Sequence, residues 1–256
     1  MRLLVFTDLD GTLLDHGSYD TGPAMPMLDR LARLGVPVIL ASSKTAAEIA
    51  GWQERLGLSH WPAIVENGAA LLDGGTDDSA YRRLRAALAG LAAPFRGFGD
   101  MTDAEVAACT GLSPADAARA RRRSHSEPGL WQGDAAGLDR FLADLAALGI
   151  TARRGGRFLT LSFGGTKAAR MAELVARFAP DTTIALGDAP NDIEMLTAAD
   201  RAIIVRNDGG PGIPPLPGED QGRVLRTRAE GPSGWAEGLA AALADLGMTE
   251  KGDSRG

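Results

Sequence analysis

Three largely apolar runs predict strands that are buried on both faces of a sheet. They are LLVFT at 3–7, VPVIL at 36–40 and TTIALG at 182–187. Continuous runs of apolar and β-branched residues are typical of parallel sheets that helices cover on both sides. We therefore expect an α/β fold with a parallel-sheet core.

Helical spacing separates the first two of these runs. Apolar residues between 23 and 34 recur at helical intervals, and Gly35 ends the predicted helix. A second helix is predicted over 44–57. The run PAIVENGAALL at 62–72 predicts a third strand, a turn and an apolar return strand. The order strand–helix–strand–helix–strand predicts that the third strand joins the same parallel sheet.

The pattern changes in the middle of the chain. Residues 76–162 mix amphipathic helices with short strands, which are predicted at EPGLWQG (127–133) and GGRFLTLSF (155–163). This region contains no buried parallel-strand pattern, which predicts an inserted α+β domain. The α/β pattern then resumes. We expect a core formed by 1–75 and 163–248, an inserted domain over 76–162, and a disordered tail at 249–256.

Composition narrows the range of partners and of cellular locations. The chain has 256 residues and a formal net charge of −6, which favours neither nucleic acid nor an anionic membrane as a partner. No signal-peptide pattern and no apolar run of about 20 residues is visible, so we expect a cytoplasmic protein without a membrane span.

Cys109 is the single cysteine, which excludes an intramolecular disulfide and predicts a small core residue. The basic run RARRRSH at 119–125 fits either a solvated helix face or a contact with an anionic substrate.

Polar side chains follow the predicted strands where each strand ends. In an open parallel sheet, ligands bind outside the carboxyl ends of the strands, so these side chains are expected to converge. The candidates are Asp8 and Asp10 after the first strand, Ser42, Ser43 and Lys44 after the second, Lys167 at the start of a late helix, and Asp188, Asn191 and Asp192 after TTIALG.

The acidic candidates suggest phosphoryl chemistry with a metal ion. Asp8, Asp10, Asp188 and Asp192 would repel one another unless a cation lay among them, and Mg²⁺ prefers oxygen ligands. One aspartate could then attack phosphorus and a second could act as acid and base. Gly11 would let the chain turn, so that Asp8 and Asp10 point in separate directions.

Other candidates could hold the phosphate group. The Ser42 hydroxyl could donate to a phosphate oxygen, and Lys167 could neutralise charge on the transferring group. Arg153, Arg154 and Arg170 compete with Lys167 for that role. The remaining candidates for the phosphate are the backbone N–H groups of Leu9, Asp10 and Ser43 and the side chain of Asn191. A lone pair of aspartates is often only a turn or a helix cap, so the prediction depends on the joint occurrence of these residues.

The motifs DLDGTLL, LASSKT, a lysine and GDAPND together resemble the haloacid dehalogenase-like phosphatase superfamily. This resemblance implies a Rossmann-like core with an inserted cap of the C2 type. It also implies that Asp8 is the nucleophile and Asp10 the acid and base. Mg²⁺ would be held by Asp8, by the carbonyl of Asp10 and by Asp188, with Asp192 in support.

A closer resemblance, carried by SSKT, IVENG, GFGDM, SEP, GGRF and GPSGW, is to the mannosyl-3-phosphoglycerate phosphatase family. It implies a small phosphorylated sugar acid as substrate, either mannosyl- or glucosyl-3-phosphoglycerate. Arg157 of GGRF could then pair with the substrate carboxylate, Asp100 of GFGDM and Glu127 of SEP could accept sugar hydroxyls, and Lys44 could also contact the substrate.

Two departures from the family pattern leave alternatives open. Thr166 and Ala168 flank Lys167 where the family has an acid and a glycine, and Ala189 replaces a common serine. A broader sugar-phosphate phosphatase, a phosphosugar mutase and a non-catalytic phosphate-binding module are the competing hypotheses. The intact set of four aspartates argues against the last of these.

Overall fold

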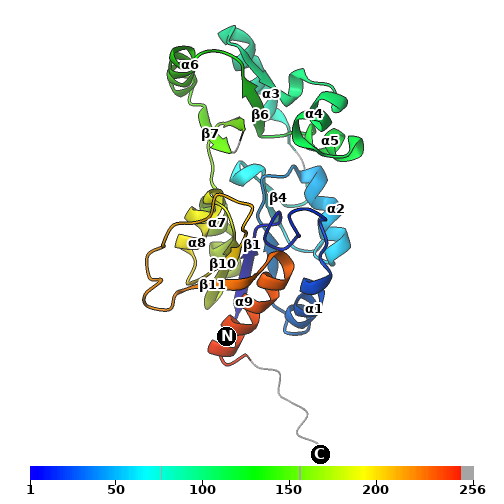
Figure 1. Ribbon diagram of the computed structural model, residues 1–256, viewed down its shortest axis with the longest axis vertical. Coiled ribbons are helices and arrows are strands. Elements are labelled where there is room, and N and C mark those ends of the chain that lie inside the picture. Colours follow the sequence, from blue (N-terminus) through cyan, green and yellow to red (C-terminus); the bar gives the residue numbers. More distant parts are fainter. Residues whose placement is uncertain (76, 156, 249–256) are drawn as a thin grey trace, which may run out of the picture. The chain divides into compact units, whose positions relative to one another are not determined.

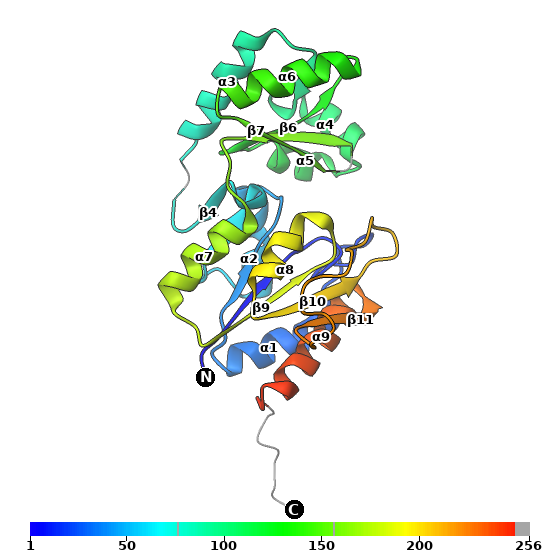
Figure 2. The same ribbon diagram turned by 90° about the vertical axis from the view of Figure 1, so that its left-hand side faces the viewer.

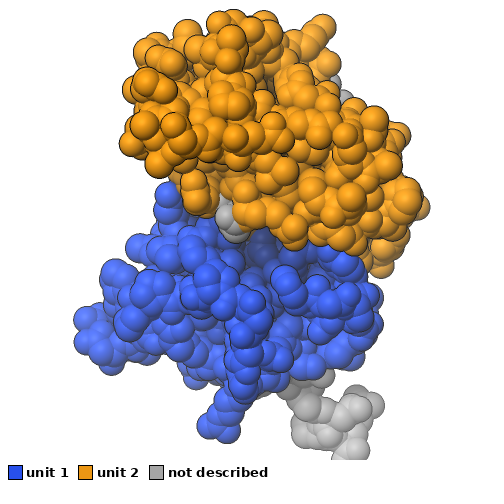
Figure 3. Space-filling view, turned by 45° about the horizontal axis from the view of Figure 1, so that its top comes forward, with its two compact units in different colours: residues 1–41, 171–256 blue, residues 42–170 orange. Residues whose placement is uncertain are grey.

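The computed structural model describes residues 1–75, 77–155 and 157–248, and it contains two compact units (Figure 3). The first unit combines the start of the chain, up to Ala41, with the part from Met171 onward, and the second unit is the continuous segment Ser42–Arg170. The division predicted from the sequence, with boundaries near 75 and 163, stays a prediction. The predicted tail at 249–256 lies outside the described residues.

The first unit is built on a five-stranded parallel sheet with the strand order β11-β10-β9-β1-β2 (Figure 1). Its strands are β1 (Leu3–Thr7), β2 (Val38–Leu40), β9 (Thr182–Gly187), β10 (Arg201–Arg206) and β11 (Val224–Glu230). Every residue of β1 is buried, as its unbroken apolar sequence predicts. The carboxyl ends of β1 and β9 lie side by side in the sheet, because Thr7 pairs with Leu186.

Helices cover both faces of this sheet (Figure 2). The helices of the first unit are η1 (Gly22–Ala24), α1 (Met25–Arg33), η4 (Pro190–Asp192), α8 (Ile193–Ala198), α9 (Gly231–Asp245) and the later turns of α7 (Lys167–Phe178). α1 and α9 lie on one face, and α7 and α8 lie on the other. Trp235 of α9 is fully buried and donates from Nε1 to Thr7 Oγ1 over 2.9 Å, which fixes α9 against the carboxyl end of β1.

The second unit begins with α2 (Ala46–Leu56) and a hairpin of β3 (Ala63–Val65) and β4 (Ala70–Leu72), joined by η2 (Glu66–Gly68). The predicted hairpin is confirmed, since β3 and β4 pair antiparallel. The prediction that the third strand joins the parallel sheet was wrong: among the described strands, β3 pairs only with β4. The turn at Asn67 and Gly68, whose φ angles are 58° and 89°, folds the apolar run back on itself, so that β3 pairs with β4.

The rest of the second unit is an α+β layer with an antiparallel sheet in the order β5-β6-β8-β7. Its elements are α3 (Ser79–Leu91), β5 (Phe95–Gly97), η3 (Phe98–Asp100), α4 (Asp103–Thr110), α5 (Pro114–Ala120), β6 (Ser126–Trp131), α6 (Ala135–Ala147), β7 (Thr151–Gly155) and β8 (Phe158–Ser162). The two central strands were expected from the sequence, whereas the edge strands β5 and β7 were not.

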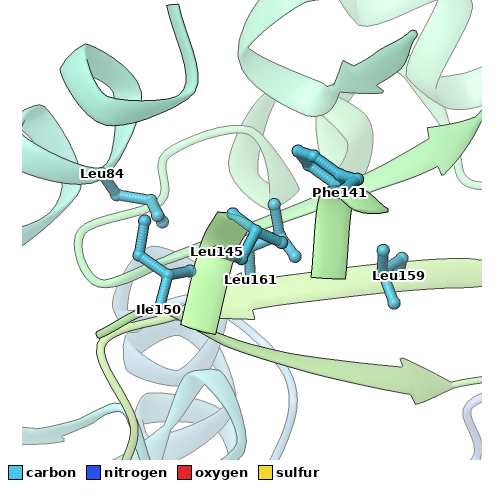
Figure 4. Packing of buried hydrophobic residues seen from close by; sticks show 6 residues of the cluster. All are labelled: Leu84, Phe141, Leu145, Ile150, Leu159 and Leu161. Atoms are coloured by element: carbon cyan, nitrogen blue, oxygen red, sulfur yellow. The ribbon is translucent and has the colours of Figure 1, made fainter. Parts of the chain in front are cut away.

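Two hydrophobic clusters hold this layer together. Figure 4 shows the first, in which side chains of α3 and α6 pack against β8; its members are Leu84, Phe141, Leu145, Ile150, Leu159 and Leu161. The second cluster is formed by Phe98, Met101, Val106 and Ala117. Side chains along β8 point alternately to the two faces of the sheet, so this strand contributes to both clusters. Leu159 and Leu161 belong to the first cluster, and Phe158 packs edge-on against Phe98 of the second.

The structure therefore confirms an α/β fold with a central parallel sheet and an α+β layer. Cys109 is partly buried against the second cluster, and burial raises the pKa of its thiol. In the described part of the chain, no helix has the length and apolar character needed to cross a bilayer.

Candidate active site

The chain reverses immediately after β1, and this reversal presents the first two aspartates. The Asp8 N–H donates to the carbonyl of Leu186 over 2.9 Å, which extends the sheet by one bond. The carbonyl of Leu9 then accepts from the N–H groups of Thr12 and Leu14 at 3.1 and 2.8 Å. Gly11 adopts a φ of 82°, a region that glycine enters without strain, so it makes the turn predicted from the sequence.

Three buried carboxylates gather at the carboxyl ends of β1 and β9. Asp8, Asp188 and Asp192 each offer an oxygen, and these three oxygens lie within 4.8 Å of one another. Asp192 also accepts hydrogen bonds from the N–H groups of Asp188 and Ala189, both at 3.2 Å, which ties the cluster to the loop after β9. A compact, buried, all-oxygen donor set of this kind fits a hard divalent cation.

Both oxygens of Asp188 are held by neighbouring side chains. The Thr12 hydroxyl donates to Oδ1 over 2.6 Å, and Asn207 Nδ2 donates to Oδ2 over 2.7 Å. Neither residue was among the sequence candidates. Asn207 follows β10 directly, so the rule that polar residues gather after parallel strands would have found it if it had been applied to that strand as well.

The other residues predicted to act at these strand ends are close to the three carboxylates in sequence, but their structural environments differ. Asp10 is not a member of the group of three carboxylates, and its backbone forms an isolated bridge with Leu14. Leu9 is fully buried, and Asn191 is exposed in η4. The metal role of the Asp10 carbonyl and the phosphate roles of Leu9 and Asn191 stay predictions.

In the second unit, the residues Ser42, Ser43 and Lys44 form a loop whose backbone is fixed. Ser42 N–H donates to the carbonyl of Ile64, and the carbonyls of Ser42 and Lys44 accept from the N–H groups of Asn67 and Glu66, all at 2.9 Å. Lys44 N–H also donates to Ser42 Oγ over 3.2 Å. The hairpin after β3 thus orients this loop, which the sequence predicted to bind phosphate.

Glu66 is a buried acid that sequence reasoning did not select. Its carboxylate accepts hydrogen bonds from the backbone N–H groups of Ser124, His125 and Ser126 and from the two serine hydroxyls, at 2.7 to 3.1 Å. Arg123 Nε lies 3.4 Å from Glu66 Oε2. Burial acts to raise the pKa of Glu66, but Arg123 and these hydrogen bonds outweigh it and hold the pKa below its ordinary value.

The basic run at 119–125 therefore does not form one solvated helix face. α5 ends at Ala120, so Arg121, Arg122 and Arg123 follow the helix. Arg122 is exposed, whereas Arg123 is buried and pairs with Glu66. An arginine is rarely buried without a partner, and Glu66 supplies that partner from more than 50 positions away.

Lys167 is the first residue of α7, and only 2% of its surface is exposed. Of its three competitors, Arg153 and Arg154 are exposed on β7, and Arg170 donates to the carbonyl of Gly68 over 3.1 Å. A buried cation near the hairpin suits a site that excludes water better than the exposed arginines do. The catalytic role of Lys167 stays a prediction.

Comparison with known proteins identifies the family. A model of the haloacid dehalogenase-like hydrolase family matches residues 5–83 and 143–209, which is more than half of the chain. The chain belongs to this family. The matched residues include Asp8, Ser42, Lys167 and Asp188, so the family match covers the candidates on both units.

Solved structures of this superfamily resemble the chain over nearly its whole length. The sucrose-phosphatase of Synechocystis sp. PCC6803, solved with sucrose and phosphate, is 19% identical with a TM-score of 0.61, covering 96% of this chain and 99% of that one. A superfamily phosphatase from Bacteroides thetaiotaomicron is 18% identical with a TM-score of 0.64, covering 97% and 96%. A subclass IIB sugar phosphatase is 15% identical with a TM-score of 0.62, covering 97% and 100%. At these identities the likeness establishes the shared fold.

The candidate cap residues Asp100 and Glu127 lie outside the family match and share one arginine. Asp100 forms an ion pair with Arg85, and Glu127 Oε1 lies 3.5 Å from Arg85 Nη1. Glu127 Oε1 also accepts from Gly99 N–H over 2.7 Å, and Asp100 accepts from Gly97 N–H over 3.0 Å. Both acids therefore hold the turn around η3. The backbone of Gly97 lies so close to Glu127 that a Cβ at this position would be 2.0 Å from Glu127 Oε1.

The electrostatic settings of these two acids differ. Glu127 is fully buried, and burial raises its pKa above the ordinary value. Asp100 is exposed, and the hydrogen bond from Arg85 lowers its pKa. The third cap candidate, Arg157, is exposed and its guanidinium lies 5.7 Å from the ring centre of Phe158. Among the described contacts, none joins Arg157 to Asp100 or Glu127.

Proposed function

We propose that the protein is a Mg²⁺-dependent phosphomonoester hydrolase that works through a phosphorylated aspartate. The observation that carries this proposal is the group of three buried carboxylates from Asp8, Asp188 and Asp192, with oxygens within 4.8 Å of one another. Membership of the haloacid dehalogenase-like hydrolase family supports it. Burying three carboxylates at the carboxyl ends of neighbouring strands raises the free energy of the folded protein unless a cation compensates their charge.

In the proposed mechanism, a carboxylate oxygen of Asp8 attacks the phosphorus atom and the bond from phosphorus to the ester oxygen breaks. Asp10 donates a proton to the departing alcohol. Asp10 then accepts a proton from water as that water attacks the phosphoryl group on Asp8, which releases inorganic phosphate and restores both residues. Asp8, the Asp10 carbonyl and Asp188 would hold Mg²⁺, which supplies positive charge to the phosphate oxygens when bound, and Asp192 would support them.

Residues of the second unit would hold the phosphate. The Ser42 hydroxyl and the N–H groups of the loop after it are proposed donors to phosphate oxygens. Lys167 is proposed to neutralise the charge that Asp8 and the phosphoryl group share. Its burial supports this role, because water screens the charge of a buried cation less than that of an exposed one.

For the substrate we propose a glycosyl-3-phosphoglycerate carrying mannose or glucose. The motif resemblance supports this choice, and Arg157 is exposed and able to pair with a carboxylate. Asp100, Glu127 and Lys44 are the proposed partners of the remaining polar groups. A broader sugar-phosphate phosphatase is the second candidate, favoured by the likeness to a sucrose-phosphatase and to a subclass IIB sugar phosphatase.

The first experiment measures phosphate release from mannosyl-3-phosphoglycerate, glucosyl-3-phosphoglycerate, sucrose 6-phosphate and mannose 6-phosphate, with Mg²⁺ and with EDTA. A strong Mg²⁺-dependent preference for either glycosyl-phosphoglycerate is expected. Equal slow turnover of all four would retain the phosphatase and rule out the specific substrate. No Mg²⁺-dependent turnover of any of them, nor of p-nitrophenyl phosphate, would contradict the proposed activity.

A second experiment tests the cap residues by alanine substitution of Asp100, Glu127 and Arg157. Each variant is expected to raise the KM for the glycosyl-phosphoglycerate far more than the KM for p-nitrophenyl phosphate. Equal effects on both substrates would mean that these residues only hold the cap turn, which is the role that their contacts with Arg85 and the glycine N–H groups already give to Asp100 and Glu127.

A further inference from the structure

Arg123 makes contacts that lead from a buried ion pair to the predicted phosphate loop. Its Nη1 and Nη2 atoms both donate to the carbonyl of Ser43 at 3.3 Å, and Nη2 donates to Ser126 Oγ at 2.7 Å. Its Nε lies 3.4 Å from Glu66 Oε2. Only a planar guanidinium presents this many donors in one rigid arrangement.

The Ser43 carbonyl that Arg123 binds belongs to the same peptide group as the N–H of Lys44. In a trans peptide the C=O and the N–H point in opposite directions within one plane, so fixing one fixes the other. The Lys44 N–H donates to Ser42 Oγ over 3.2 Å. A continuous chain of hydrogen bonds therefore runs from Arg123, through the Ser43–Lys44 peptide, to the hydroxyl of Ser42.

This series of hydrogen bonds determines in which direction the Ser42 hydroxyl can donate its proton. A hydroxyl has one proton to donate and two lone pairs, and one lone pair of Ser42 Oγ already accepts from Lys44. Its own proton is consequently directed away from that N–H. Arg123 also polarises the intervening peptide, which strengthens the bond from Lys44 N–H to Ser42 Oγ.

The Arg123 guanidinium is itself held in position. Glu66 is 2% exposed and accepts the N–H groups of three consecutive residues, so the acid that pairs with Arg123 is fixed by the backbone. The carbonyls on either side of Ser43 are bonded to the N–H groups of Asn67 and Glu66. Arg123 therefore supplies the bond to the one carbonyl of this loop that the hairpin backbone does not reach.

We infer that Arg123 is a positioning residue for the phosphate site, acting on the Ser42 hydroxyl through the Ser43–Lys44 peptide. The inference rests on the proposed function, because it concerns the phosphate donor of that same site. It gives the second unit a part in phosphate binding through a residue that lies 80 positions beyond the loop it orients.

The test is a double-mutant cycle between Arg123→Met and Ser42→Ala, with binding of inorganic phosphate measured by calorimetry in the presence of Mg²⁺. Arg123→Met should weaken phosphate binding about tenfold when Ser42 is present, which is the size of one hydrogen bond to a charged group. In the Ser42→Ala background the same substitution should change binding less than about twofold. Equal weakening in both backgrounds would overturn the inference, because a general structural effect would not depend on Ser42.

Two further variants keep the result interpretable. Arg122→Met removes the neighbouring exposed arginine and should bind phosphate as the parent protein does. Arg123→Lys retains the positive charge beside Glu66 but lacks the planar set of guanidinium N–H donors, so this variant should fold and should bind phosphate more weakly than the parent protein does. Phosphate binding equal to that of the parent would overturn the inference, even if Arg123→Met does not fold. Failure of the parent protein to bind phosphate or to hydrolyse p-nitrophenyl phosphate would instead overturn the proposed function.

Discussion

Asn207 Nδ2 donates a hydrogen bond to Asp188 Oδ2 over 2.7 Å, while the Thr12 hydroxyl holds the other oxygen of the same carboxylate. Residues from two different loops thereby fix the rotation of the Asp188 carboxylate. Groups that bond to a metal-binding carboxylate set its orientation, and they contribute to metal affinity without touching the ion. Asn207 is therefore part of the proposed Mg²⁺ site.

Replacing Asn207 by alanine should weaken Mg²⁺ binding by roughly 10- to 100-fold, the range found for residues that orient metal ligands. The measurement is calorimetric titration with Mg²⁺, supported by the shift in melting temperature that Mg²⁺ produces. Asp208→Asn is the matched control, because Asp208 is the next residue, is exposed and pairs with Arg206. Mg²⁺ affinity in Asn207→Ala equal to that of the parent would contradict a role for Asn207 in holding Asp188.

Gly11→Ala should abolish Mg²⁺ binding for a steric reason. A Cβ at this position would lie 2.7 Å from Asp188 Oδ2 and 2.8 Å from Asn207 Nδ2, so it would displace the two groups that the metal site requires. The φ of 82° adds a strain of roughly 1–2 kcal/mol for any residue with a Cβ. Calorimetric titration with Mg²⁺ and urea unfolding would measure the two effects separately.

Gly57→Ala is the control that separates strain from collision. Gly57 ends α2 with a φ of 69°, but a Cβ there would have no atom within 4 Å. Both variants should lose the stability that the strained φ costs, Gly11→Ala should lose more because of the collision, and only Gly11→Ala should lose Mg²⁺ binding. Loss of binding in both would mean that general destabilisation, and not the collision with Asp188, is responsible.

The acidic cluster could be predicted from the sequence because its signals are local. Each of Asp8 and Asp188 directly follows a buried apolar run, and the geometry of parallel sheets brings such strand ends together. The central strands of the α+β layer were predictable for the same kind of reason, since their apolar residues form clear runs. The edge strands were not: β5 has three residues, and β7 (TARRG) is largely polar, as edges often are.

The role of Arg123 could not be predicted because it depends on contacts that are distant in sequence. Arg121, Arg122 and Arg123 are chemically identical neighbours, and no periodicity distinguishes the buried one from the exposed one. What distinguishes them is the position of Glu66 in a hairpin turn with a φ of 52°, which is set by tertiary structure. A buried ion pair between separate segments leaves no local pattern that a reading of one sequence could detect.

Phe141→Ala should destabilise the second unit by about 3–5 kcal/mol, the usual cost of removing a buried aromatic side chain. Phe141 is 3% exposed and stacks on Phe95 and Trp131, with ring centres 5.6 and 5.1 Å apart. Urea unfolding would measure the loss. Leu148→Ala is the control at the end of the same helix, because Leu148 is 48% exposed and should change stability by less than about 0.5 kcal/mol. Similar losses in both variants would contradict the assignment of Phe141 to the core of this layer.

Glu66→Gln should lower the free energy of unfolding by about 3–5 kcal/mol near neutral pH, because it leaves Arg123 buried without its charge partner. The folded pKa of Glu66 lies below its ordinary value of 4.5, so its stabilisation is present above that value and is lost as the pH falls through the folded pKa. The difference between parent and variant should therefore shrink below about pH 4.5 in urea titrations. A difference that stays constant down to acidic pH would contradict an ionised Glu66.

Glu127→Gln should show the opposite dependence on pH. Glu127 is fully buried, and burial raises its folded pKa above the ordinary value of 4.5, so the folded state favours the protonated carboxyl. The stability that this carboxyl contributes is complete below the unfolded pKa and is lost as the pH rises through the folded pKa. A glutamine cannot ionise, so the variant should gain stability relative to the parent as the pH rises. Urea unfolding of both proteins from about pH 4 to about pH 8 measures this difference. If the variant instead lost stability relative to the parent over that range, Glu127 would be ionised in the folded protein and held by Arg85, which lies 3.5 Å away.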